Sequence, residues 1–407
     1  MTDRIDKDKD GIDFNWSILL IISLSSIILG IYRDGIAAIF PFLQKDFSLT
    51  RAQIGLYMTS LYFISSIVSL FSGYLVDIKG TKWSIAYGIL FIGILLMLHS
   101  IAPNYISLLL LAALGGFGLS INSPAANRGI KEYFSARWRS TATGIWSSSF
   151  PVGGLLAASF LPVLGVMFGW RKALLFPSVM AILCSLVILK FYDKNDKSDN
   201  ATKINKISFG TNFNRLFKNV DLLALSVYGF FLGCVESSII SHFTLFLFLD
   251  GGLSEKISGM GFAMVQLGSI LGRPIWGLFC DRFLSSNRRK GFLFIGILFI
   301  IIALFFSISI KILNLYIIFV FAFLAGFIGQ GWNGLFFSSI TDVVNENQTG
   351  SAIGLSMLFL RAGMLITPPI FGLIADIRNS YDLSWLLLGL IMLIASVGQY
   401  LFFKRRR

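Results

Sequence analysis

Long apolar segments dominate this chain and restrict what it can fold into. Twelve of them run over residues 16–40, 53–76, 83–101, 105–128, 140–165, 171–191, 221–249, 257–281, 291–311, 314–338, 350–375 and 382–403. A helix needs about 20 apolar residues to cross a bilayer core about 30 Å thick. Because hydrocarbon offers no partners to backbone polar groups, such segments must be helical. The sequence therefore predicts an all-α membrane protein with twelve transmembrane helices in the lipid bilayer.

Composition excludes several other classes. The chain is 55% hydrophobic and only 14% charged, which leaves a water-soluble protein too little polar surface. Cys184, Cys234 and Cys280 have no metal-ligand spacing, and His99 and His242 cannot form a metal site by themselves. No nucleophile–base arrangement and no phosphate-binding glycine loop is present in the sequence. We therefore expect neither an enzyme nor a bound metal or cofactor.

The basic residues alternate between the two sides of the membrane. With both termini inside, 24 of the 34 Lys and Arg residues fall in cytoplasmic segments, seven in outer loops and three within spans. The positive-inside rule then predicts a multi-pass protein of the plasma (inner) membrane with both termini in the cytoplasm. The net charge of +13 is spread over membrane flanks rather than gathered in one domain. We therefore expect no nucleic-acid partner.

The chain repeats itself on either side of a polar linker. In order, the matching segments are LGIYRDGIAAIF (29–40) with LGCVESSIISHF (232–243), LTRAQIG (49–55) with LSEKISG (253–259), GYLVDIKGTK (73–82) with GLFCDRFLSS (277–286), and STATG (140–144) with GSAIG (350–354). The predicted domains are an N-terminal six-helix bundle (1–190), a cytoplasmic linker (191–220) and a C-terminal six-helix bundle (221–407). The repeats predict that the two bundles are related by a pseudo-two-fold axis along the membrane normal.

One repeated segment resembles the loop signature of the major facilitator superfamily. Its positions are filled by Gly73, Asp77, Lys79, Gly80 and Lys82, with Ile78 as an extra residue after the aspartate. The second copy has Gly277, Asp281 and Arg282 in the regular spacing. The segment IKEYFSARWRSTATG (130–144) is similar to the four–five loop of the organic-anion branch of that superfamily. The resemblance covers almost the whole chain and implies a transporter.

These loop charges suggest a gate. An aspartate at the cytoplasmic end of span two can face the N-terminus of span eleven, where free N–H groups and the helix dipole favour negative charge. We expect Asp77, with Lys79 and Lys82, to hold the outward-open form in this way, and Asp281 with Arg282 to do the same toward span five. The alternative is that these charges only mark the cytoplasmic boundary.

Two adjacent charges, Arg33 and Asp34, interrupt the first span. Since a charge at membrane depth costs roughly 2.5–3.5 kcal/mol on insertion scales, it should be paired or face a cavity. The repeat places Arg33 opposite Glu236 of span seven, which predicts an anion near Arg33 and a proton-coupling carboxylate at Glu236. Burial disfavours a charged carboxylate and favours proton uptake. Asp34 is an equal candidate for the proton, and a static ion pair or an anchor of the helix end is the alternative.

Two more arginines lie within spans. Arg273 precedes a proline eight residues before Asp281, which resembles span eight of monocarboxylate and oxalate carriers, where the arginine binds a carboxylate. The planar guanidinium suits that task because it forms two parallel hydrogen bonds. For Arg361 in span eleven, contact with the substrate and packing within the protein are equal alternatives. Neither charge recurs in the other half, where Ser69 and Pro151 occupy the matching positions.

Other polar residues are weaker candidates for substrate contacts. They are Tyr32 in span one, Asn122 in span four, and Gln330 and Asn333 in span ten. Each amide could equally bridge helices. Together, these features predict a monomeric secondary transporter that moves a small organic anion, a carboxylate, by alternating access with H⁺ coupling. The alternatives are a drug or amphipath exporter of the same fold and a non-transporting membrane sensor.

Overall fold

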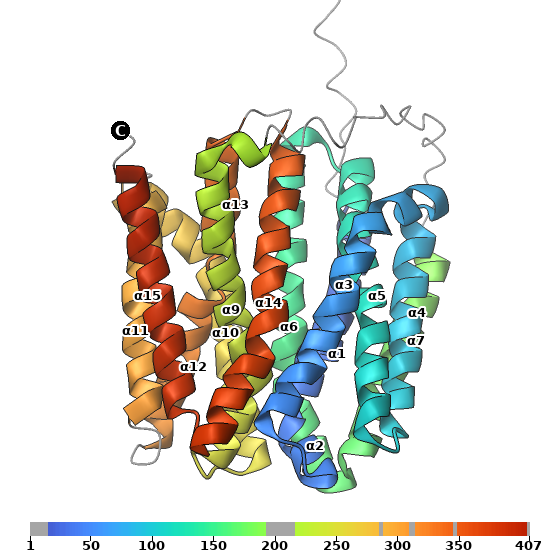
Figure 1. Ribbon diagram of the computed structural model, residues 1–407. Helices are drawn as coiled ribbons and strands as arrows, with labels where there is room; N and C mark the ends of the chain where they lie inside the picture. Colours follow the sequence, from blue (N-terminus) through green and yellow to red (C-terminus); the bar gives the residue numbers. More distant parts are fainter. Residues whose placement is uncertain (1–14, 193–215, 285–287, 309–313, 345–347, 405–407) are drawn as a thin grey trace, which may run out of the picture.

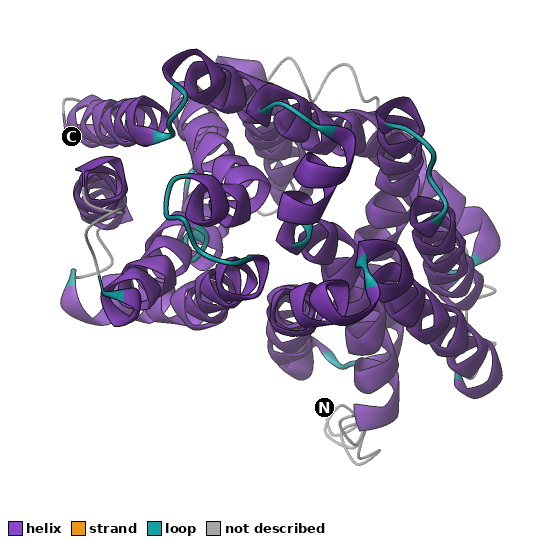
Figure 2. Cartoon of the chain, turned by 90° about the horizontal axis from the view of Figure 1, so that it is seen from below, coloured by secondary structure: helices purple, strands orange, loops and turns teal. Residues whose placement is uncertain are grey.

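The chain folds into helices joined by short loops. The computed structural model describes residues 15–192, 216–284, 288–308, 314–344 and 348–404. Within these ranges there is no β-strand, and a view along the helix axes shows only helices and connecting loops (Figure 2). The prediction of an all-α architecture is confirmed.

Every predicted span coincides with a helix. The N-terminal helices are α1 (Trp16–Ala38), α2 (Phe40–Phe47), α3 (Arg51–Lys79), α4 (Thr81–Ser100), α5 (Tyr105–Tyr133), α6 (Ala136–Phe168) and α7 (Trp170–Phe191). The C-terminal helices are α9 (Val220–Leu249), α10 (Glu255–Phe283), α11 (Arg288–Ile308), α12 (Leu315–Gly329), α13 (Asn333–Asp342), α14 (Thr349–Arg378) and α15 (Asp382–Lys404). The tenth predicted span is divided between α12 and α13.

Ten spans in the described residues are long and apolar enough to cross a membrane, or eleven if the bent helix α3 is one span. The helix at the eighth predicted span, α10, is not among them. It carries Gln266, several serines and glycines, and Arg273, all of which lower its hydropathy. Polar residues within a spanning helix face the protein interior rather than lipid, so α10 becomes a candidate for lining the site.

Local signals fix where the helices begin, and they recur in the two parts of the chain. Thr50 caps α3 with a capping box, because its side chain accepts from Gln53 N–H while the Gln53 side chain accepts from Thr50 N–H. Ser254 caps α10 by accepting from Ile257 N–H. Thr50 and Ser254 occupy equivalent positions in the predicted repeat, so the repeat extends to the helix caps.

Two ends of the molecule must be distinguished. We call "termini end" the one at which α1 begins and α15 ends, and "distal end" the one that carries α2 (Figure 1). Helices α3 and α14 pack along each other, as do α6 and α10, and these two pairs join the N-terminal helices to the C-terminal ones. The linker predicted at 191–220 falls mostly outside the described residues.

Close helix crossings repeat in both parts. A Cβ added to Gly30 of α1 would meet the backbone oxygen of Phe150 in α6, and one added to Gly233 of α9 would meet that of Leu360 in α14. Since only glycine allows backbones to approach this closely, both crossings are fixed by the sequence. They bring Arg33 and Glu236, each three residues further along, to the same level of the molecule.

Candidate functional site

A cluster of charges lies where the N-terminal and C-terminal helices meet. Arg33 donates from Nε to Asp34 Oδ1 at 2.6 Å and from Nη2 to Asp34 Oδ2 at 3.2 Å. Its Nη1 lies 4.0 Å from Oε1 of Glu236 in α9, and its guanidinium lies over the Phe150 ring, 4.4 Å from the centroid. The three charged side chains are 12%, 0% and 7% exposed, respectively. We call Arg33, Asp34 and Glu236 the central cluster.

The other two intramembrane arginines also reach across this junction. Arg273 of α10 donates from Nη1 to the backbone oxygen of Ser147 in α6 at 3.0 Å. Arg361 of α14 donates from Nη1 to the backbone oxygen of Ser65 in α3 at 3.1 Å. Neither is in an ion pair among the described residues, whereas Arg33 is balanced by Asp34 and Glu236. The excess positive charge therefore comes from Arg273 and Arg361 rather than from Arg33.

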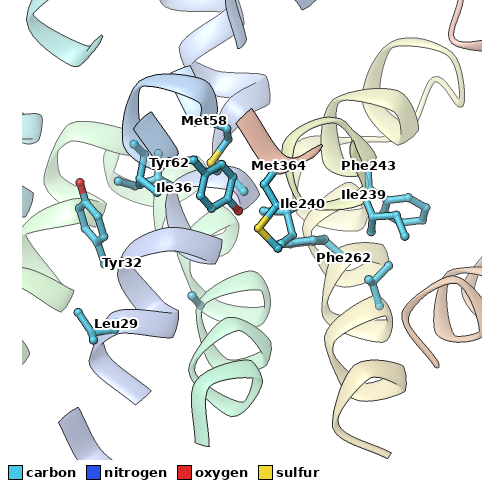
Figure 3. Close-up of a cluster of buried hydrophobic side chains, with 14 of the residues drawn as sticks. Leu29, Tyr32, Ile36, Met58, Tyr62, Ile239, Ile240, Phe243, Phe262 and Met364 are labelled. Atoms are coloured by element: carbon cyan, nitrogen blue, oxygen red, sulfur yellow. The ribbon is translucent and has the colours of Figure 1, made fainter. Parts of the chain in front are cut away.

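Buried and mostly apolar side chains lie on the distal side of the central cluster. They are Ile36, Met58, Tyr62, Ile240 and Met364, all at most 7% exposed. Figure 3 shows the Tyr62 ring of α3 and the Met364 side chain of α14 pointing toward each other, with Ile240 of α9 beside them. We call these five residues the apolar layer. Ile36, Ile240 and Met364 follow Arg33, Glu236 and Arg361 by three or four residues on α1, α9 and α14, in the direction of the distal end.

Beyond the apolar layer, the helix pairs are in close contact at the distal end. A Cβ on Gly55 of α3 would meet the backbone of Pro368 and Pro369 in α14. One on Gly259 of α10 would lie 2.9 Å from the backbone oxygen of Ala158 in α6. Gly55 and Gly259 are equivalent in the repeat, so both helix pairs close this end in the same way.

A carboxylate completes the distal closure. Asp376, near the end of α14, accepts backbone hydrogen bonds from Arg51 and Ala52 at the start of α3, both at 2.9 Å. Arg51 also donates to the side chain of Asn379 at 3.2 Å. Four N–H groups at a helix N-terminus lack partners within the helix, and the helix dipole adds attraction for an anion. We call the Asp376 contact with Arg51 and Ala52 the distal clamp.

Sequence reasoning missed the distal clamp, although its signal is visible. The segment GLIADIR (372–378) has the same spacing as GYLVDIK (73–79): a glycine, an aspartate four residues later, then Ile and a basic residue. Gly372 would clash with the backbone of Arg51 if it carried a Cβ, so the glycine and the aspartate act on the same helix start. The sequence analysis expected this arrangement only for Asp77, at the other end.

At the termini end the same four helices are apart. A Cβ added to Gly73, Gly144, Gly277 or Gly354 would find no neighbour within 4 Å. These glycines lie eighteen residues from Gly55, Pro162, Gly259 and Gly372, which are all packed at the distal end. Eighteen residues make five helical turns, so on α6, α10 and α14 the open positions continue the faces that are in contact at the distal end, whereas Gly73 lies beyond the bend in α3. The structure is closed at the distal end and open at the termini end.

The predicted gating residues lie at this open end. Asp77 is exposed and pairs with Arg128 of α5 at 3.2 Å, and therefore with its own group of helices. Lys79 and Arg282 are exposed, and Lys82 is half-buried. The side chain of Asp281 lies outside the described part of the chain. The expected contact of Asp77 with the start of α14 stays a prediction for a state in which the termini end is closed.

The softer candidates lie in several places. The Tyr32 hydroxyl donates to the backbone oxygen of Leu111 at 3.4 Å, and Figure 3 shows Tyr32 on the far side of α1 from the Tyr62–Met364 pair. The Asn122 amide is engaged by Ser25 and Ser26 of α1 at 2.9 and 3.0 Å. For Asn122, the helix-bridging alternative accounts for the contacts observed.

Gln330 and Asn333 form the break between α12 and α13. Asn333 donates from Nδ2 to the backbone oxygen of Gln330 at 3.1 Å, while the buried Nε2 of Gln330 has no partner among the described residues. The described residues contain no group of three or more His, Cys, Asp or Glu side chains placed to hold a metal ion.

Comparison with known proteins identifies the family. The sequence profile of the Major Facilitator Superfamily matches residues 22–265 and 243–407, which is more than half of the chain. This chain belongs to the major facilitator superfamily. As a superfamily member it is a non-enzymatic, multi-pass membrane transporter, and the predicted fold is confirmed. The family match covers the whole superfamily and does not identify a branch, so the organic-anion branch stays a prediction.

Several relatives share most of the chain. The hexuronate transporter of Bacillus subtilis (strain 168) is 22% identical over 403 residues, which cover 94% of this chain and 93% of the relative. The fosmidomycin resistance protein of Escherichia coli (strain K12) is 29% identical over 275 residues, covering 64% and 65%. A crystal structure of a bacterial homologue of the human lysosomal transporter Spinster, inward-facing and unoccupied, aligns with a TM-score of 0.77 at 19% identity, covering 95% and 96%.

The distal clamp gives a first testable expectation. Asp376→Asn should make the distal end open more often, because hydrogen bonds to a charged group contribute roughly 1.5–3 kcal/mol each. A cysteine at Met58, in the apolar layer, should then be alkylated about tenfold faster by a membrane-impermeant maleimide applied from the distal side. Asp46→Asn is the matched control, since Asp46 bonds to Trp170 and Arg171 within the N-terminal helices. Equal alkylation rates in the two variants would contradict the clamp.

Proposed function

We propose that this transporter carries a small organic anion, a carboxylate, by alternating access coupled to H⁺. One observation carries the proposal: Arg33, Arg273 and Arg361 all lie at the junction of the two helix groups and contact the opposite group, rather than facing lipid. Arginines at this depth are expensive unless they serve a pathway. Arg273 and Arg361 each donate one hydrogen bond to a backbone oxygen in this structure. To bind a carboxylate, each guanidinium would give up that one bond and form two.

The orientation follows from the basic residues. We assign the termini end to the cytoplasm of a plasma (inner) membrane, because 24 of the 34 Lys and Arg residues fall on that side and seven on the other. The structure is then the inward-open state. In the outward-open state we expect Gly73 to pack against α14 near Gly354, and Gly144 to pack against α10 near Gly277. Asp77 would then leave Arg128 and cap α14, as Asp376 caps α3 here.

The proposal also includes a movement of the two helix groups relative to each other. The N-terminal bundle (1–190) and the C-terminal bundle (221–407) would rock about the central cluster, joined by the linker (191–220), within one monomer. The relative named as a hexuronate transporter supports an anionic substrate. The resemblance of Arg273 and its following proline to carboxylate carriers supports the organic-anion branch.

A ligand screen tests the substrate class. A ligand that binds only the folded protein stabilises it, by about 2.7 kcal/mol at one hundred times the dissociation constant. We expect carboxylates in a panel of mono- and dicarboxylates, sugar acids, amino acids and lipophilic cations to raise the melting temperature of the purified protein. The second candidate, an exporter of drugs or amphipaths, is supported by the relative named as a fosmidomycin resistance protein. Stabilisation by lipophilic cations alone would favour that exporter and overturn the carboxylate proposal.

Proton coupling predicts how the acids of the central cluster behave. Glu236→Gln removes the titratable group that lies 4.0 Å from Arg33 but preserves its shape and hydrogen-bonding capacity. In proteoliposomes, uptake driven by a pH gradient should fall at least tenfold, whereas exchange of labelled for unlabelled substrate should continue. Asp34→Asn is tested in parallel, because either acid can carry the proton. Gradient-driven uptake that survives in both variants would rule out coupling through this cluster.

A further inference from the structure

Gln266 of α10 is a buried polar side chain without a hydrogen-bond partner in the part of the chain that the structure describes. It is 0% exposed, and neither its Oε1 nor its Nε2 has a hydrogen-bond partner among the described residues. More than about 90% of buried polar groups in proteins are paired. An unpaired one costs roughly 1–3 kcal/mol. Because both atoms of the amide are free, the observation does not depend on which atom is assigned as oxygen.

The amide lies beside the central cluster. A Cβ added to Gly154 of α6 would contact Asp34 Oδ2 of α1 and would lie 2.9 Å from Cδ of Gln266. Gly259 and Arg273, each seven residues from Gln266 along α10, both contact α6. Residues seven apart share a helix face. Gln266 thus lies on the face of α10 that borders the junction, between the distal contact at Gly259 and the guanidinium of Arg273.

The chemistry of this spot complements that of the arginines. Asp34 accepts from Arg33 through both oxygens, and Gln266 makes no hydrogen bond to it in this structure. The Gln266 amide offers one acceptor and two donors without any charge. A carboxylate has acceptors only, so it can pair with Nε2 but leaves Oε1 unsatisfied. A hydroxyl is both donor and acceptor and satisfies Oε1.

We propose that Gln266 is a substrate-binding residue that accepts a hydrogen bond from a hydroxyl group, and that the transported anion is therefore a hydroxylated carboxylate. This inference rests on the proposed function and narrows its substrate class. A ligand that presents a hydroxyl and an acidic oxygen near each other matches both atoms of the amide. On α10, Arg273 is the nearest basic residue to Gln266, two turns away on the same face. It is therefore the candidate on this helix for binding the acidic group of the ligand.

Matched pairs of ligands test the proposal. The probes are lactate with propionate, threonate with butyrate, and gluconate with hexanoate, so that each pair shares a carbon chain and differs in hydroxyls. Affinities are measured by thermal shift and by competition for uptake in proteoliposomes. In the wild-type protein, the hydroxylated member of at least one pair should bind about tenfold more tightly. Gln266→Leu should weaken that member about tenfold and leave its plain partner unchanged.

A second glutamine supplies the control. Gln399 of α15 is also buried and also has an unpartnered Nε2, but α15 packs on α11, away from the central cluster. Gln399→Leu should change neither affinity, which separates loss of a buried amide from loss of a ligand contact. Gln266→Asn, with a shorter amide, should retain part of the preference.

The possible failures are distinguishable. If no carboxylate of either kind binds, the anion-carrier proposal itself fails. If carboxylates bind but the wild type shows no preference for hydroxylated members, the role of Gln266 is overturned while the carrier proposal stands. Equal weakening of both members in Gln266→Leu would also overturn it, because a merely structural role predicts that result.

Discussion

Gly354→Leu should stop transport while leaving the protein folded and able to bind its substrate from the termini end. In this structure a Cβ added at the position has no neighbour within 4 Å, so the substitution meets no clash at Cβ. In a helix, leucine is also more stable than glycine by roughly 0.8–1 kcal/mol. When the termini end closes, however, the side chain must enter a contact built for glycine. Such overpacking typically costs about 1–3 kcal/mol, which lowers the closed population roughly 5- to 150-fold, given about tenfold for every 1.4 kcal/mol.

The measurement combines uptake, stability and conformation. Uptake of the most stabilising carboxylate should fall by at least about fivefold, and the melting temperature should not fall. Spin labels are placed at the exposed residues Trp83 and Phe283, with the native cysteines replaced by serine. The distance between the two labels should then show only the value of the state that is open at the termini end. Gly277→Leu should behave in the same way, because it lies on the other helix pair.

Gly398→Leu is the matched control for this experiment. A Cβ added to Gly398 also has no neighbour within 4 Å, but Gly398 lies on α15, which packs mainly on α11, α9 and α14. It should gain the same helix propensity and transport normally. If Gly354→Leu transports as well as Gly398→Leu, the four open glycines have no part in closing the termini end.

Arg33→Gln should be the most destabilising single change at the central cluster. It would leave Asp34, which is 0% exposed, without the guanidinium that donates to both its oxygens. Removing one partner of a buried ion pair typically costs about 3–5 kcal/mol, because the remaining charge is buried and unpaired. We expect a clearly lower melting temperature in detergent and transport reduced about a hundredfold.

A double variant separates stability from transport. Arg33→Gln combined with Asp34→Asn removes both charges, and a buried pair replaced together is often neutral in stability. The melting temperature should therefore recover, while transport should not, if Arg33 also serves the substrate pathway. Recovery of transport along with stability would reduce Arg33 to a structural ion pair, which is the alternative left open by the sequence.

Much of the architecture could be predicted from the sequence. Hydropathy placed every span on a helix, because a membrane demands long apolar segments and offers the backbone no other structure. The break between α12 and α13 was missed, since GQGWNG (329–334) reads as apolar enough to continue a helix. The repeat correctly paired Arg33 with Glu236, because glycine crossings fix both at one level.

The contacts of individual side chains could not be predicted in the same way. Whether Arg33 binds Asp34 or a substrate depends on rotamers that spacing does not encode. The role of Asp376 depends on which end is closed, and the same sequence must support both states. Gln266 escaped notice because a glutamine in a serine- and glycine-rich helix looks ordinary until its lack of partners is known.

The apolar layer has a consequence for energy conservation. Hydrated ions do not enter hydrocarbon, and a single unpaired charge in such a medium costs far more than thermal energy. Ile36, Met58, Ile240 and Met364 are all at most 7% exposed, so a charge moving from Glu236 to the distal end in this state would have to pass buried hydrocarbon side chains. Under the proposed coupling, a proton on Glu236 would reach the distal compartment only after the distal end opens, which would keep the gradient from leaking between turnovers.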